Sequence, residues 1–145
     1  MKRIICLLLA ISICLVLCYS MVSCVDKENV KAELIGKWYY AGKGVTDNNY
    51  TEELVIFYSN GTAEYAEDYY YVSDSGKKSH WDFMSYYIDG TYEITEDYII
   101  VSGPGKYLNG EEFETSRRKF PYTYNSDSGK ITKLGGNFNF KKISN

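Results

Sequence analysis

The single histidine of this 145-residue sequence is the first side chain to consider for catalytic or metal chemistry. His80 follows Lys77-Lys78-Ser79, and no motif around it supplies the nucleophile and orienting carboxylate that a catalytic histidine needs. We therefore interpret His80 as a surface residue, with an axial haem ligand as the alternative. A lone histidine also excludes most histidine-based metal sites, and we expect neither a metal nor another cofactor.

Carboxylates are the second group with chemical potential. They gather where strands are expected to end and turns to begin, at Glu52, Glu53, Glu67, Asp68, Glu111, Glu112 and Glu114. A pair of them could lie at the spacing of glycosidase carboxylates, but a solvated rim is the simpler interpretation. Gly103-Pro104-Gly105-Lys106 lacks the rest of a phosphate-binding loop and is interpreted as a turn. We therefore expect that the protein is not an enzyme.

Basic residues form one run, Arg117-Arg118-Lys119, and strand alternation would divide it between the two faces of a sheet. The chain has 16 basic and 19 acidic residues and a pI near 5.2. Because nucleic-acid surfaces need clustered positive charge, we expect no nucleic-acid partner.

Cysteines mark the N-terminal segment. All four lie there, at Cys6, Cys14, Cys18 and Cys24, and none follows. Lys2 and Arg3 precede an apolar run from Ile4 to Leu17, which is shorter than the roughly 20 residues of a membrane span. This order is typical of an export signal. The rest of the chain therefore has no disulfide and no thiolate metal site.

Ser23-Cys24, shortly after the apolar run, resembles the lipobox of bacterial lipoproteins. The resemblance implies a signal peptide over residues 1–23, lipidation of Cys24, and a lipidated tether over residues 24–35. Residues 25–29 resemble the short acidic signal of surface-exposed lipoproteins in Bacteroidota. We expect an outer-membrane lipoprotein of the cell envelope, exposed at the surface or facing the periplasm. An uncleaved anchor and a plain secretory peptide are the alternatives.

The remainder has the period and composition of β-strands, with a helix signal only at Lys27–Ile35. Asn60-Gly61 predicts a type I′ hairpin, Glu96-Asp97 a second tight reversal, and Asp89-Gly90 a bulge or kink within a strand. Tight connections in succession predict an all-β antiparallel meander of about eight strands closed into a small barrel, with a sandwich as the alternative. The predicted strands are Lys37–Lys43, Glu52–Ser59, Thr62–Val72, His80–Thr95, Tyr98–Gly103, Glu112–Tyr124, Lys130–Leu134 and Asn137–Ile143.

Gly36-Lys37-Trp38 at the start of the first strand resembles the first signature of the lipocalins and of lipocalin-like lipoproteins of Bacteroidota. Leu54–Thr62 and Phe138–Ile143 resemble the second hairpin and the closing strand of the same lipoproteins. The resemblance implies a lipocalin-like barrel domain over residues 36–145. It also implies that Trp38 closes one end of the barrel under a basic side chain, which here would be Lys141 or Lys142.

Tyrosine is unusually frequent, at 16 residues, and its ring and hydroxyl suit an amphipathic lining. Alternation puts Met84, Tyr86, Ile88, Tyr92 and Ile94 on one face of their strand. We predict a ligand site formed by Tyr40, Tyr58, Met84, Tyr86 and Ile88; the alternative is that these side chains fill the interior. The Tyr69-Tyr70-Tyr71 run could likewise stack on sugars or fill a core.

These patterns predict a monomeric, non-enzymatic lipoprotein that is held at a membrane by its lipid anchor. Its ligand would be a small apolar or amphipathic molecule or a glycan. The alternative is a protein-interaction or inhibitor module, similar to the barrel-shaped lysozyme inhibitors, with a filled core and no small ligand.

Overall fold

The computed structural model describes residues 27–43, 48–82 and 84–144. The predicted signal peptide and Cys24 lie outside the described residues. A helix over residues 27–34 precedes the strands, and none of the described helices has the length and apolar character to cross a membrane. The described residues form nine strands: β1 (Gly36–Lys43), β2 (Asn49–Phe57), β3 (Thr62–Val72), β4 (Lys78–His80), β5 (Tyr86–Ile94), β6 (Tyr98–Tyr107), β7 (Glu112–Asn125), β8 (Lys130–Leu134) and β9 (Lys141–Ser144).

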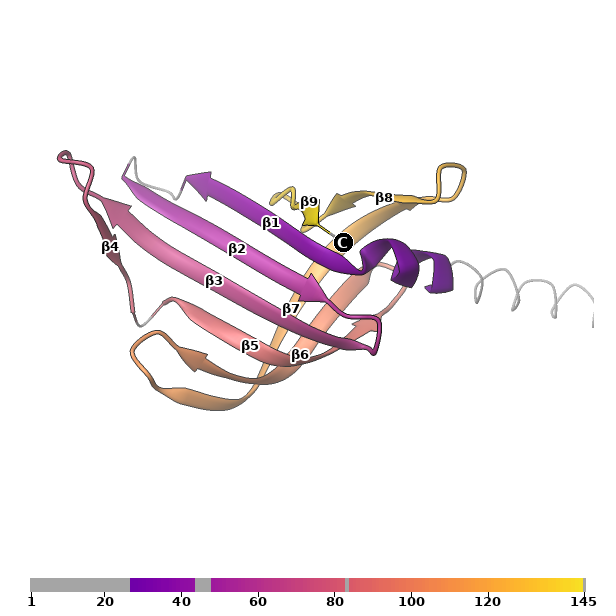
Figure 1. Cartoon of the computed structure of the whole chain (residues 1–145), viewed down its shortest axis with the longest axis horizontal. Coiled ribbons are helices and arrows are strands. Elements are labelled where there is room, and N and C mark those ends of the chain that lie inside the picture. Colours follow the sequence, from indigo (N-terminus) through magenta and orange to yellow (C-terminus); the bar gives the residue numbers. More distant parts are fainter. Residues whose placement is uncertain (1–26, 44–47, 83, 145) are drawn as a thin grey trace, which may run out of the picture.

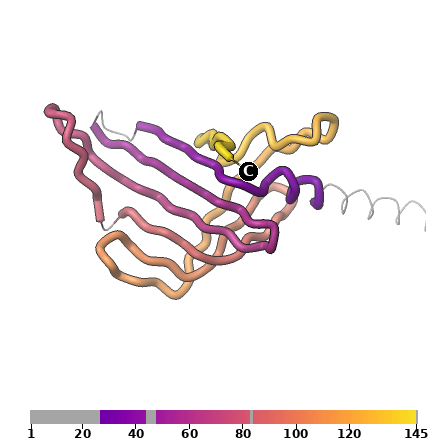
Figure 2. Tube along the Cα trace, in the orientation of Figure 1, coloured from indigo at the N-terminus to yellow at the C-terminus, as the bar shows by residue number. Residues whose placement is uncertain are grey.

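The strands form one antiparallel meander that curls into a nearly closed barrel (Figure 1). Strand order is β8-β7-β6-β5-β3-β2-β1-β9, and the short β4 pairs with β3 outside this path. Figure 2 follows the same chain as it crosses from β1 to β3 on one side and returns through β6 and β7 on the other. The all-β antiparallel fold predicted from the alternation and the tight turns is confirmed.

The β2–β3 turn differs from its prediction. Gly61 has a φ of 90°, but no residue other than glycine has a positive φ among the described residues, so the turn is not type I′. The Gly61 N–H donates to the Tyr58 carbonyl at 3.1 Å, and the Asn60 Oδ1 accepts from the backbone N–H of Thr62 at 3.0 Å. The Asn60 side chain therefore caps the turn while glycine alone takes the left-handed conformation.

The predicted long strand His80–Thr95 is wrong in its first half. β4 ends at His80, and the Trp81 carbonyl accepts from the N–H groups of Met84 and Ser85, so the chain turns before β5 begins. The Ser85 hydroxyl anchors this turn, because it accepts from the Tyr69 N–H at 2.9 Å. The sequence alternates on both sides of the break, so it gave no sign of it. The break is stabilised by a tertiary contact with β3.

Close packing between β5 and β6 explains the glycine in the middle of β5. A Cβ on Gly90 would lie 2.0 Å from the Ser102 carbonyl oxygen, so only glycine fits there without a shift of the backbone. The bulge itself lies in the neighbouring ladder, where the register of β6 and β7 shifts between Gly103 and Gly105. Asp89 and Gly90 themselves have no Cα partner in the β5–β6 ladder, so the sequence indicated the position at which strand pairing is interrupted.

The core fills one end of the barrel. Alternating residues of β2 and β3 point inwards, among them Val55, Phe57, Ala63 and Tyr65. On β5 the predicted face is confirmed for Tyr86, Ile88, Tyr92 and Ile94, which are buried or half-buried while their neighbours are mostly exposed. The core cluster also contains Val30, Leu34, Trp38, Ile99, Val101, Phe120, Ile131, Leu134 and Phe140.

Two of these core residues come from the segment expected to be a tether. Val30 and Leu34 lie one helical turn apart on the helix over residues 27–34, and both are buried. This helix covers the end of the barrel where β1 begins (Figure 1). Residues 27–34 are therefore part of the packed domain and not a solvated linker.

Candidate functional site

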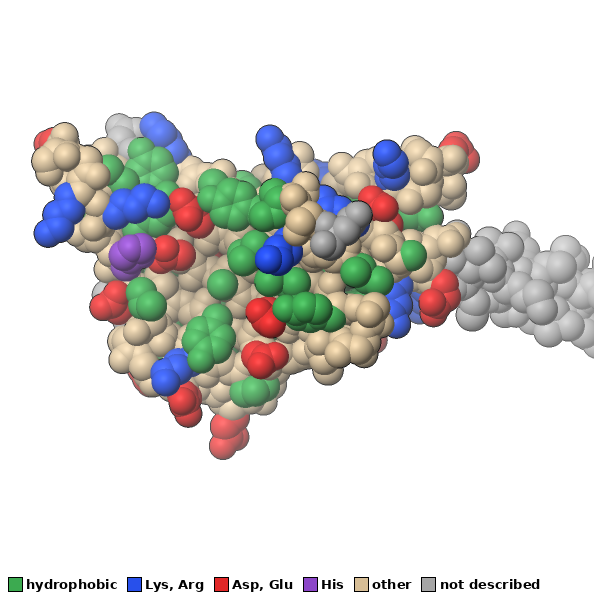
Figure 3. Space-filling model, viewed as in Figure 1, with side chains coloured by type: hydrophobic (Ala, Val, Ile, Leu, Met, Phe, Trp, Pro, Cys, Tyr) green, Lys and Arg blue, Asp and Glu red, His purple; other side chains and the backbone are tan. Residues whose placement is uncertain are grey.

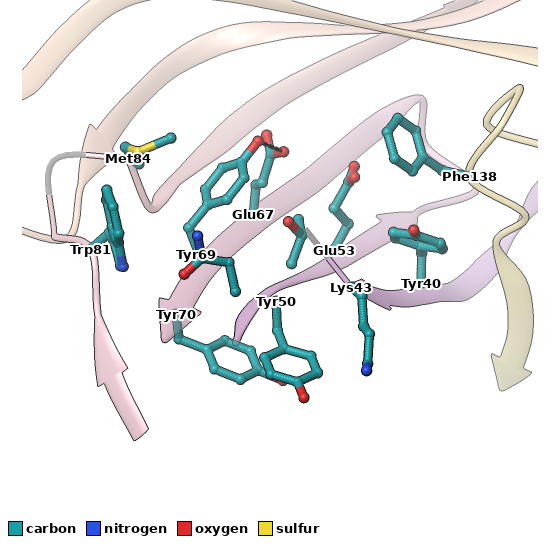
Figure 4. A pocket seen from close by; sticks show the side chains of 12 residues that line it. Tyr40, Lys43, Tyr50, Glu53, Glu67, Tyr69, Tyr70, Trp81, Met84 and Phe138 are labelled. Carbon is teal, nitrogen blue, oxygen red and sulfur yellow. Dashed lines mark hydrogen bonds between the residues drawn. The ribbon is translucent and has the colours of Figure 1, made fainter. Parts of the chain in front are cut away.

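A cavity of about 450 Å³ opens at the end of the barrel away from the helix. β1 ends and β2 begins beside it, and β3 contributes from the other side (Figure 4). Its walls are mainly aromatic, and its lining includes Tyr40, Lys43, Tyr50, Thr51, Glu53, Glu67, Tyr69, Tyr70, Trp81, Met84 and Phe138. A cavity of this size, mostly apolar with a few polar groups, is typical of small-molecule sites.

Two carboxylates at this cavity are buried. The side chain of Glu53 is 1% exposed and that of Glu67 is 4% exposed. The Tyr65 hydroxyl lies 2.7 Å from Glu53 Oε2 and 2.9 Å from Glu67 Oε2, so its single proton is shared between them. The Tyr69 hydroxyl donates to Glu67 Oε1, an interaction drawn in Figure 4.

One guanidinium faces both carboxylates. Arg118 Nη2 donates to Glu53 Oε2 at 3.0 Å and lies 3.8 Å from Glu67 Oε1. The Arg118 side chain is 30% exposed, so it links the buried pair to the outside. Because one positive charge opposes two carboxylates, the cluster carries excess negative charge when both are ionised.

The environment changes the acidity of these groups. Burial raises the pKa of Glu53, and the charge of Glu67 raises it further, although the Tyr65 hydrogen bond and Arg118 act in the opposite direction. Burial, followed by the charges of Glu67 and Glu53, raises the pKa of Tyr65 well above its usual range. Tyr65 is therefore a hydrogen-bond donor to the carboxylates at neutral pH.

The raised pKa of Glu53 makes a prediction for Glu53→Gln. The folded protein holds the Glu53 proton more tightly than the unfolded chain, so ionisation lowers wild-type stability. This loss of unfolding free energy begins as the pH rises past about 4.3, the ordinary pKa of a glutamate side chain, and is complete above the pKa of Glu53 in the folded protein. We expect the unfolding free energy of Glu53→Gln to improve relative to wild type over that window, measured by urea unfolding at a series of pH values. A difference that does not change with pH would contradict it.

The predicted ligand residues do not all come together. Tyr40 and Met84 line the cavity. Tyr86 does not belong to this lining; it is half-buried, with its ring 5.9 Å from that of Tyr65 and 6.0 Å from that of Phe113. Ile88 is buried in the core.

Tyr58 lies apart from this group. It follows β2 at the other end of that strand, it is exposed, and its hydroxyl donates to Glu64 at 2.8 Å. The expectation that Tyr58 points into the barrel is wrong, because the inward face of β2 carries Val55 and Phe57, and Tyr58 has the opposite parity.

Trp38 lies at the covered end of the barrel. Its indole Nε1 donates to the Leu34 carbonyl at 2.8 Å, which ties β1 to the helix. Lys142 Nζ lies 5.7 Å from the centre of the Trp38 ring and donates to the Glu33 carbonyl at 2.6 Å. The indole therefore lies between the last turn of the helix and a lysine of β9.

The buried ionic cluster was missed. The expectation of a solvated carboxylate rim is wrong for Glu53 and Glu67. The position of each residue in the alternation of its strand could have indicated its burial. Glu53 is two residues from Val55, and Glu67 is two residues from Tyr65, so each shares a face with a core residue. The predicted division of the basic run is confirmed, because Arg118 enters the cluster while Arg117 and Lys119 are exposed.

His80 lies outside this cluster and is exposed. Its Nδ1 is 3.0 Å from Asp68 Oδ1, which also accepts from the Ser85 hydroxyl at 2.9 Å. The Asp68 carboxylate thus lies between the His80 ring and the Ser85 hydroxyl, whereas in a catalytic triad the histidine lies between the nucleophile and the carboxylate. Among the described residues, no group of three or more His, Cys, Asp or Glu side chains could hold a metal ion.

The outer surface is mixed in character. On the face shown in Figure 3, hydrophobic side chains form separate patches with Lys, Arg, Asp and Glu between them. The aromatic cavity with its ionic cluster is therefore the more distinctive feature. Comparison of the chain with family models, curated proteins and solved structures gives no match.

Proposed function

We propose that this protein is a membrane-tethered, non-enzymatic binding protein that takes one small amphipathic molecule into the open end of its barrel. The observation that supports this proposal is the cavity of about 450 Å³, which combines aromatic walls with a small polar cluster. Apolar contact would supply affinity, and the few polar groups would fix the orientation of the ligand. The protein acts as a monomer at the outer membrane of the cell envelope, and Cys24 carries the lipid.

A bulky side chain in the cavity should prevent binding. Thr51 lines the cavity and is half-buried, so Thr51→Trp fills space that the ligand would use. We expect the affinity for a ligand that copurifies with the wild-type protein to fall about tenfold or more, because contact area is lost. Native mass spectrometry of the full-length protein released from lipid nanodiscs would detect the ligand and its loss.

Thr91→Trp is the matched control, because Thr91 is exposed on the outer face of β5. It should leave binding unchanged. If no small molecule is bound by the wild-type protein, or if both variants bind equally well, the proposal is overturned in favour of a protein-interaction module.

Membrane attachment should depend on one cysteine. Since two or more acyl chains anchor a protein stably, Cys24→Ala should move the protein from the detergent phase to the aqueous phase in a Triton X-114 partition. Cys18→Ala removes a cysteine that lies before the proposed cleavage site and should have no effect. Retention of Cys24→Ala in the membrane fraction would argue for an uncleaved anchor.

A further inference from the structure

One atom of the buried cluster has no partner. Glu53 Oε2 accepts hydrogen bonds from Tyr65 and Arg118, but Glu53 Oε1 is buried and makes no hydrogen bond to any described residue. Leaving a buried carboxylate oxygen unpaired costs more than leaving a neutral group unpaired. Glu53 belongs to the lining of the cavity, so this buried free acceptor lies close to the space that a bound molecule would occupy.

The charges around this acceptor favour a cation. Glu67 is the second buried carboxylate, and Arg118 is already shared between the two. Lys43 also belongs to the lining, but it is exposed at the rim and points away from Glu53 in Figure 4. A positive group at Glu53 Oε1 would balance the second carboxylate, whereas a carboxylate or phosphate would add a third negative charge.

The aromatic walls of the cavity are also suited to a cation. The ring centres of Tyr40 and Phe138 are 5.0 Å apart in an edge-to-face contact, and both residues border the cavity near Glu53 (Figure 4). Tyr50 and Tyr70 stack on one another at 5.4 Å on another wall. Aromatic faces attract cations and also bury apolar surface, so they can hold both parts of an amphipathic amine.

We infer that the ligand is a protonated amine on an apolar body, and that its N–H donates to Glu53 Oε1 while the apolar body lies among Tyr40, Tyr50, Tyr70 and Phe138. This inference rests on the proposed function and specifies its ligand class. A neutral donor would satisfy the free acceptor but would leave the excess negative charge in place.

Three near-isosteric probes of different charge test the inference: 2-phenylethylammonium, 2-phenylethanol and 3-phenylpropanoate. Binding is measured by isothermal titration calorimetry on the full-length protein in nanodiscs, with the heat of empty nanodiscs subtracted. We expect the ammonium to bind about tenfold or more tightly than the alcohol, because only the ammonium also offsets the second negative charge. The propanoate should bind most weakly, because it adds a third negative charge. Equal affinities, or a preference for the propanoate, would overturn the inference.

Glu53→Gln keeps the shape and the bonds to Tyr65 and Arg118 but removes the charge. It should lose the preference for the ammonium over the alcohol, while Glu64→Gln, on the outer face of β3, should retain it. The wild-type series decides the question by itself if Glu53→Gln does not fold. A copurifying ligand that is neutral or acidic would overturn the inference and leave the proposed function standing, whereas the absence of any ligand would overturn both.

Discussion

Trp38→Ala should cost about 3–5 kcal/mol of unfolding free energy, the usual cost of truncating a buried aromatic residue. Trp38 is 4% exposed, and its removal also breaks the hydrogen bond to Leu34 and the contact with Lys142. Because domains are typically stable by about 5–15 kcal/mol, this variant should be close to unfolding at room temperature. Urea denaturation followed by far-UV circular dichroism would measure the loss.

The second tryptophan of the chain provides the control. Trp81 is 38% exposed at the turn between β4 and β5, so Trp81→Ala should cost about 1 kcal/mol or less. The two substitutions remove the same side chain from the covered end and from the open end of the barrel. Similar stability losses for both would show that Trp38 does not hold the helix to the barrel.

Arg118→Met should destabilise the protein by up to about 3 kcal/mol, because it leaves two buried carboxylates without their cation. This expected loss of unfolding free energy is at the low end for breaking a buried ion pair, because the Arg118 side chain is 30% exposed. The loss should shrink at acidic pH, because burial raises the pKa of Glu53 and its protonation removes part of the repulsion. Thermal and urea unfolding at two pH values would measure it.

Arg117→Met is the matched control one residue earlier. Arg117 points outwards, and its contact with Glu93, at 4.0 Å, is between two exposed side chains. Such surface pairs contribute about 0–1 kcal/mol, so this variant should be almost as stable as wild type. Adding Glu53→Gln to Arg118→Met should recover part of the loss. A double variant no more stable than the single one would place the cost elsewhere than in the repulsion.

Much of the architecture followed from local patterns. Thr62–Val72 and Lys130–Leu134 were predicted with the bounds that the structure shows, because each is a strand bordered by strong turn residues. The break before β5 was not predictable in this way. It depends on Ser85 contacting the backbone of Tyr69, and the two residues are distant in the sequence.

The candidate site was predicted only in part. Tyr40 and Met84 were placed at the cavity by parity and composition. Tyr58 was misplaced because both faces of its strand are apolar in the sequence, and the inward one proved to be that of Val55 and Phe57. Glu53, Glu67 and Arg118 were missed because charged residues are normally solvated. Each lies two residues from a buried residue of its own strand (Val55, Tyr65 or Phe120), which indicated burial. The cation that faces both Glu53 and Glu67 is Arg118 of β7, far away in the sequence.

The packed helix limits how far a lipid on Cys24 would hold the barrel from a bilayer. If Cys24 is acylated, only Val25 and Asp26 separate it from the first residue of the helix, and an extended chain of that length reaches about 10 Å. The covered end of the barrel would then rest against the lipid headgroups, and the open end would point away from the bilayer. A ligand would then enter from the aqueous side, and the cavity would open outwards at a fixed height above the lipid.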